Sequence, residues 1–139
     1  EIIKLLLLEH RIAFVCTLVH ELTPVCELFA SLLFPLRWRH LFIPLVCRPM
    51  AEALKKMSDS EYPFLVGLPR FVYVRPEISS SMPNNTYIVF LDRNEITDEK
   101  KQSIPSSAIP NLPSPLEENL RDSIHALARV LTMPDGTVS

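Results

Sequence analysis

Four short apolar runs are spaced along the first two-thirds of the chain, and each is rich in β-branched and aromatic residues. Each run is bounded by charged or turn-forming residues and shows no alternation of apolar and polar positions. This is typical of a strand buried on both faces, as in a parallel sheet that helices cover on both sides. The runs are residues 11–16 (RIAFVC), 41–46 (LFIPLV), 62–68 (YPFLVGL) and 86–92 (TYIVFLD).

Amphipathic stretches separate these runs and predict helices. Thr23 and Pro24 are the residue types of an N-cap and a first helical position, so we expect a helix to begin there. Between the third and fourth runs, residues 69–83 are expected to be irregular, with a short strand or turn at 71–74. The helix predicted to begin at Thr23 and Pro24 has apolar residues at intervals of three and four, which define its core face: Val25, Leu28, Phe29, Leu32, Leu33 and Leu36.

Two more helices are expected further along the chain. Residues 49–57 predict a short one. Ser114, Pro115 and Glu117 have the spacing of a capping box after a linker rich in proline and serine, and they predict the start of a longer one. Its core stripe is Leu116, Leu120, Ile124, Leu127 and Leu131.

The alternation of helices and strands predicts an α/β fold with parallel strands joined by right-handed crossovers. We expect three α/β/α layers around a mostly parallel sheet, of a Rossmann or flavodoxin-like type. Residues 1–102 are expected to form this lobe, and residues 103–139 a linker and the following helix. The chain begins with Glu1 and enters at once an apolar run that looks like the end of a helix. We expect the fold to be incomplete at both ends.

Several function classes have no support in the composition. Gly67 and Gly136 are the only glycines, so neither a G-x-G-x-x-G loop, a Walker loop nor a G-x-S-x-G elbow can be built. The formal charge is -2 and the 14 Lys and Arg residues form no basic tract, so we expect no nucleic-acid partner. No apolar run approaches the roughly 20 residues that a membrane-spanning helix requires.

Catalytic candidates are few. His20 follows the first predicted strand, where an open sheet commonly binds ligands, and Cys16 or Cys47 could be a nearby nucleophile. The alternative, which we favour, is that both cysteines fill the core and His20 is a loop residue. We expect no catalytic site and no cofactor. We also expect no metal site, although one acidic group could bind a divalent cation instead of forming a solvated loop: Asp92, Asp98 and Glu99.

Five segments, in this order, resemble the central part of a DENN domain. That family's pattern runs from a leucine-rich helix into a strand, through a helix with an aromatic-Pro-x-x-Trp type of ending, to I-P and P-F-L-x-G strands and a P-x-L-P segment. Trp38, after Phe34-Pro35-Leu36, is the most telling feature, whereas Phe90 departs from the family by replacing the first Asp of a D-x-D strand end. The segments are LLLLEHRIAFVC, LTPVCELFASLLFPLRWRHLFIPL, YPFLVGLP, YIVFLDRNEI and IPNLPSPLEENLRDSIHAL.

The resemblance implies a function without bond-making chemistry. DENN modules combine a longin-like lobe with an α/β lobe and act as guanine-nucleotide exchange factors for Rab GTPases. It therefore implies a Rab-type GTPase as partner, a missing longin-like lobe of the same parent protein, and no cofactor. It also implies a cytoplasmic protein. Peripheral attachment to vesicle or endosomal membranes through its partners is compatible with the resemblance but is not required by it. The alternatives are a DENN-like scaffold or GTPase-binding module without exchange activity, and a small α/β hydrolase that uses His20 and a cysteine.

The partner surface is expected at the carboxyl ends of the strands, where loops vary without disturbing the core. The loop after the first strand contains apolar residues in a turn, where solvent would favour polar ones. We therefore predict partner binding by Leu18, His20 and Leu22, with Arg48 as a charged rim. An alternative for Leu22 is that it packs beneath the start of the helix.

Overall fold

The structure is a computed structural model that describes residues 1–47, 49–50, 52, 62–80, 82–105, 108–109 and 113–131, with side chains up to residue 126 in the last segment. The chain has two compact units, Glu1–Ile109 and Pro110–Ser139. The second unit contains α6 (Ser114–Leu131), the helix predicted from its capping residues. Within α6, Arg121 pairs with Glu117 one turn earlier at 3.3 Å.

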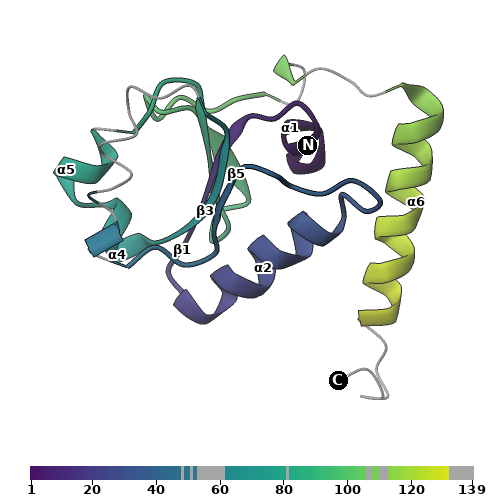
Figure 1. Cartoon of the computed structure of the whole chain (residues 1–139), viewed down its shortest axis with the longest axis horizontal. Coiled ribbons are helices and arrows are strands. Elements are labelled where there is room, and N and C mark those ends of the chain that lie inside the picture. Colours follow the sequence, from purple (N-terminus) through teal and green to yellow (C-terminus); the bar gives the residue numbers. More distant parts are fainter. Residues whose placement is uncertain are drawn as a thin grey trace. The chain divides into compact units, whose positions relative to one another are not determined.

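Within the described residues, the first unit contains one five-stranded sheet (Figure 1). β1 (Arg11–Cys16) is central and pairs in parallel with β3 (Phe64–Pro69) and β4 (Thr86–Phe90). β2 (Leu41–Ile43) pairs in parallel with β3 at one edge, and β5 (Glu95–Thr97) pairs antiparallel with β4 at the other. The predicted α/β fold with a mostly parallel sheet is confirmed.

Helices lie on both sides of this sheet (Figure 1). α1 (Ile2–Leu7) and α2 (Val19–Ser31) cover one face, where Phe14 of β1 stacks on Phe29 of α2 with ring centres 5.3 Å apart. The short helices α4 (Arg70–Tyr73) and α5 (Pro76–Ser79) cover the other face. All residues of β1 and β3 are buried, as their uninterrupted apolar sequences predict.

The start of α2 differs from the prediction. α2 begins at Val19 with Leu18 as its N-cap residue, so Pro24 lies inside the helix instead of at its first position. Proline removes one backbone hydrogen bond there, but burial of Leu22 and Cys26 against the sheet offsets that loss. The predicted core face is also partly wrong, because Leu28 and Leu36 are exposed.

Other boundaries need smaller corrections. The predicted strand 41–46 ends at Ile43, because Pro44 has no N–H for the ladder. Pairing with β3 resumes at Val46, whose N–H donates to the Gly67 carbonyl at 2.8 Å. Residues 70–73 form α4, where a short strand or turn was predicted. Most of the short helix predicted at 49–57 lies outside the described residues.

Candidate functional site

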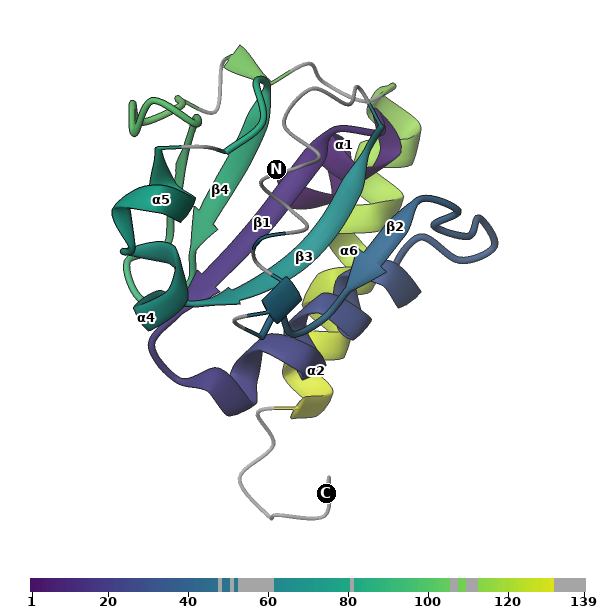
Figure 2. The same ribbon diagram turned by 60° about the vertical axis from the view of Figure 1, so that its left-hand side comes forward.

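Three parallel strands end together at one edge of the sheet, which we call the carboxyl edge (Figure 2). In the strand register, Cys16 at the end of β1 lies opposite Pro69 at the end of β3, and Val15 lies opposite Phe90 at the end of β4. The segments that follow these strands are therefore neighbours: the 17–18 turn, the start of α4 and the 91–93 turn. This is the edge where the sequence placed a partner surface.

Asp92 fixes the turn after β1. Its carboxylate accepts hydrogen bonds from the Thr17 amide at 3.0 Å and from the Thr17 hydroxyl at 2.8 Å, both at Oδ2. The Cys16 thiol donates to its other oxygen, Oδ1, at 3.4 Å. Because Asp92 follows β4 and Thr17 follows β1, these bonds hold two separate turns in one arrangement.

The titration of these groups follows from the same contacts. The hydrogen bond from the Thr17 side chain lowers the pKa of Asp92 below its ordinary value, and Arg70 adds a smaller effect in the same direction. Burial raises the pKa of Cys16, and the neighbouring Asp92 and Glu21 carboxylates raise it further. Cys16 is therefore a protonated hydrogen-bond donor. It lacks the depressed pKa that activates a cysteine nucleophile.

The other two cysteines also give no support to the hydrolase alternative. Cys26 is fully buried, and burial raises its pKa to about 12. Cys47 is exposed, so the prediction that it fills the core is wrong. Cys47 comes after β2, whose regular ladder ends at Ile43, and directly follows the fully buried Val46.

Exposed apolar side chains lie beside the fixed turn. Leu18 is 49% exposed, and Phe71 and Val74, in and just after α4, are 56% and 58% exposed. His20 in the first turn of α2 and Arg70 at the start of α4 are exposed polar neighbours. We call these five residues the carboxyl-edge surface. Apolar groups with a polar rim are the composition of a protein-binding patch.

The four residues predicted to bind a partner differ in their positions in the structure. It places Leu18 and His20 at the exposed start of α2, as a contact role requires. It corrects Leu22, which is fully buried against the sheet because the helix starts earlier than predicted and turns this residue inward. Arg48 lies outside the described residues.

Sequence reasoning did not include the residues in and beside α4 that belong to the carboxyl-edge surface. The sequence predicts a short strand or turn at 71–74 and gives no role to Arg70. The available signal was their position, since RFVYV directly follows a buried strand that ends at the same edge as β1. A helical turn there buries Val72 and Tyr73 and exposes the residues on either side of them.

In the part of the chain that the structure describes, no three His, Cys, Asp or Glu side chains are grouped so that they could hold a metal ion. None of the helices described there is both long and apolar enough to span a bilayer.

Comparison with known proteins matches a family model and several curated relatives. The family model described as the DENN (AEX-3) domain matches residues 1–94. DENN domain-containing protein 2A of Mus musculus and of Homo sapiens are each 32% identical over 78 residues, which are 56% of this chain and 6% of each relative. MAP kinase-activating death domain protein of Mus musculus is 22% identical over 132 residues, which are 92% of this chain and 8% of that protein. The chain thus spans a small part of the relatives it matches.

Proposed function

This chain belongs to the DENN domain family, and from that membership we propose that it is part of a guanine-nucleotide exchange factor that binds a Rab-type GTPase and promotes release of GDP. The observation that carries the proposal to particular residues is the pair of exposed apolar side chains, Leu18 and Phe71, beside a turn held by Asp92. Exchange is a property of the whole parent protein, in which a longin-like lobe completes the binding site.

Exchange of this kind is a matter of linked binding equilibria. A factor that binds the nucleotide-free GTPase more tightly than the loaded form lowers nucleotide affinity by the same ratio. It does so by holding the switch segments, which the phosphates and Mg²⁺ otherwise order, in a different arrangement. The factor itself makes and breaks no covalent bond, so this mechanism asks only for a contact surface of fixed shape.

The carboxyl-edge surface has the properties that such a contact needs. Leu18, Phe71 and Val74 supply apolar area that is lost from water on binding, while His20 and Arg70 form a polar rim. The three hydrogen bonds at Asp92 order the turn before the partner arrives. Less conformational entropy is then lost on binding, which raises affinity without new contacts.

The test measures release of fluorescently labelled GDP from a panel of Rab GTPases, with the full-length parent as the exchange factor. We expect one or a few GTPases to release GDP faster, and the double variant Leu18→Asp/Phe71→Asp to remove the acceleration while the parent stays folded. The matched control is Leu28→Asp, because Leu28 is 39% exposed on α2 outside the carboxyl-edge surface. Acceleration that survives the double variant would place the interface elsewhere.

The same measurement separates exchange from simple binding. If the parent binds a nucleotide-free GTPase through Leu18 and Phe71 but does not accelerate release, the chain is a DENN-like binding module without exchange activity. A function on membrane GTPases also suggests a cytoplasmic protein that reaches vesicle or endosomal membranes through its partners. Imaging of the tagged parent checks that location.

A further inference from the structure

A second exposed apolar region lies at the opposite end of α2. The 34–39 loop, which connects α2 to β2, contains Phe34 and Leu36, which are 85% and 62% exposed. α2 has 13 residues, so its two ends are about 20 Å apart at the usual helical rise. The loop is therefore separate from the carboxyl-edge surface and plays no part in the function proposed above.

The backbone of this loop is held in place by its own hydrogen bonds. The Phe34 amide donates to the Ser31 carbonyl at 3.0 Å, and the Leu36 amide donates to the Leu33 carbonyl at 2.8 Å. At the base of the loop, the Trp38 indole donates to the Leu41 carbonyl at 3.0 Å. The exposed side chains are thus presented by ordered turns.

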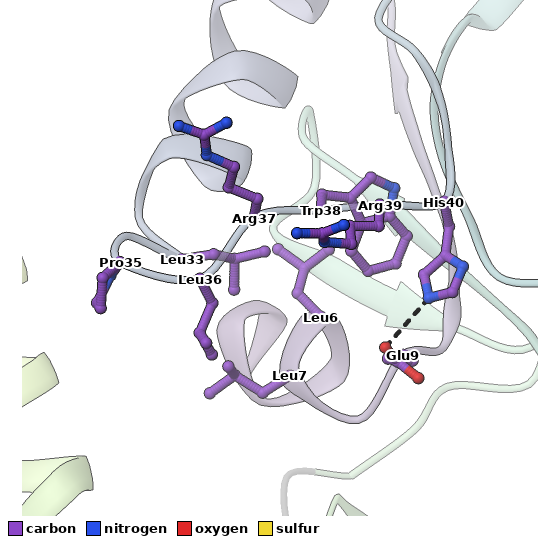
Figure 3. A pocket seen from close by; sticks show the side chains of 10 residues that line it. All are labelled: Leu6, Leu7, Glu9, Leu33, Pro35, Leu36, Arg37, Trp38, Arg39 and His40. Carbon is purple, nitrogen blue, oxygen red and sulfur yellow. Dashed lines mark ion pairs between the residues drawn. The ribbon is translucent and has the colours of Figure 1, made fainter.

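Two positive charges lie within the loop. Arg37 and Arg39 are exposed, and among the described residues neither has a carboxylate within ion-pair distance. The Glu9 carboxylate, which lines the hollow beside the loop, pairs with His40 at 3.1 Å (Figure 3). The loop therefore presents apolar tips together with two guanidinium groups that are not neutralised.

Hollows on either side of Trp38 leave these side chains accessible. One, of about 400 Å³, lies between Trp38 and the leucines of α1, and Arg37 points away from those leucines (Figure 3). The other, of about 480 Å³, lies between Phe34, Trp38 and Phe42. Neither encloses the outer part of the Phe34 ring, which projects into solvent.

We propose that the 34–39 loop docks on an anionic phospholipid surface. Phe34 and Leu36 enter the boundary between headgroups and acyl chains, and Arg37 and Arg39 bind lipid phosphate and carboxylate groups. Trp38 lies at the level of the headgroups, where its amphipathic ring is favoured. A lipid surface suits the loop better than a peptide does. Protruding apolar side chains can insert into a deformable lipid layer, whereas a bound peptide needs a groove that encloses it.

The wild-type chain supplies its own probe, because Trp38 is the single tryptophan. Its fluorescence is measured with vesicles of phosphatidylcholine alone and with vesicles of phosphatidylcholine mixed with phosphatidylserine. We expect a blue shift, and quenching by lipids brominated near the headgroup, with the mixed vesicles only. We also expect the binding to weaken as salt is added, because the arginine contribution is screened.

Variants measured by vesicle sedimentation test the residues separately. Phe34→Asp/Leu36→Asp should abolish binding, and Arg37→Gln/Arg39→Gln should weaken it about tenfold or more, as the loss of two surface cations predicts. The control Arg75→Gln/Arg93→Gln removes the same charge from arginines paired with Glu77 and Glu95 and should leave binding within about twofold. Melting temperatures check that every variant is folded.

Three results would overturn the proposal. One is a Trp38 signal that does not change with anionic vesicles. Another is equal binding to neutral and anionic vesicles. The third is a signal that depends on protein concentration and not on lipid, which would assign the loop to contact between copies of the chain. Misfolding of a variant would not affect the fluorescence test of the proposal, because that measurement uses the unmodified protein.

Discussion

Gly67 lies so close to Pro44 that a Cβ atom at position 67 would stand 2.1 Å from the Pro44 carbonyl oxygen. The same Cβ would be 3.0 Å from the Pro44 carbonyl carbon and 3.3 Å from the Cys26 sulfur. The close approach lets the edge segment after β2 return to β3, where Val46 donates to the Gly67 carbonyl. A side chain at position 67 would clash with the Pro44 backbone, which explains why a glycine occupies this buried strand position.

Gly67→Ala is expected to destabilise the chain by about 3 kcal/mol, since a methyl group in this contact forces the backbone at Pro44 to move. Urea unfolding of the variant measures the loss. Cys26→Ala in the same background is the control, and it should not rescue stability, because the tightest contact is with backbone. A rescue would show that the sulfur, and not the Pro44 carbonyl, sets the limit.

Arg11 joins two connecting segments at the amino ends of the strands. Its side chain is almost fully buried and donates from Nε to the Tyr62 carbonyl at 3.1 Å and from Nη1 to the Asn84 carbonyl. Arg11→Met should cost about 2 to 3 kcal/mol of unfolding free energy, because it removes the charged donor of two part-buried hydrogen bonds. Arg11→Lys should recover only part of the loss, since an ammonium group lacks the planar geometry to reach both oxygens. Equal stability of Met and wild type would contradict this.

Tyr73 presents the opposite case, a buried hydroxyl without a partner among the described residues. Its ring packs edge-on against Phe90 with centres 5.5 Å apart, and Tyr73→Phe keeps that contact. Removal of an unsatisfied polar atom should raise the unfolding free energy by up to about 1 kcal/mol. Thermal melting measures the change, and a clear loss of stability would indicate a water molecule or another group bound to the hydroxyl.

The central strands could be predicted because burial on both faces leaves a strong mark on sequence. β1 begins and ends where the run RIAFVC does, and β4 begins at Thr86 as expected. The edge strand was predicted too long, since Pro44 has no N–H for the ladder, and the return of the chain to β3 at Val46 involves a close approach to the distant Gly67. Local pattern cannot reveal a contact between segments far apart in the chain.

Helix starts were less predictable, and this affected the candidate site. Thr23-Pro24 is a good start signal, but contacts with the sheet outweigh it and add a turn from Val19, which buries Leu22. Trp38, the residue most telling of the family pattern, is half-buried at the base of an exposed loop. Surface residues such as Phe71 were missed because an apolar sequence of four residues does not distinguish a strand from one helical turn.

The lowered pKa of Asp92 predicts how stability depends on pH. The unfolded chain binds a proton at Asp92 more readily than the folded chain does, so the contribution is fully present above the ordinary pKa of 3.8 and is lost as pH falls through the lower folded value. Melting from about pH 7 to about pH 3 should show a constant gap between wild type and Asp92→Asn that closes only at the acid end. Thr17→Val should reproduce most of the effect, because the Thr17 hydroxyl is its largest cause. A gap that is independent of pH would contradict the assignment.

Leu18 allows folding and partner binding to be separated in one substitution. It is the N-cap residue of α2 and its side chain makes no capping hydrogen bond, whereas Asp and Asn are favoured at that position. Leu18→Asp should therefore keep or raise the melting temperature of the parent, with up to about 1 kcal/mol of added helix stability. In the same protein it should slow stimulated GDP release about tenfold, a loss of roughly 1.4 kcal/mol of transition-state binding, because a carboxylate replaces an apolar contact. Leu18→Asn is the matched control for charge, since it caps equally well and should slow release by a similar factor if the lost apolar contact is the cause. Unchanged release in both variants would show that Leu18 is not part of the interface. A fall in melting temperature would show that the Leu18 side chain contributes to folding stability.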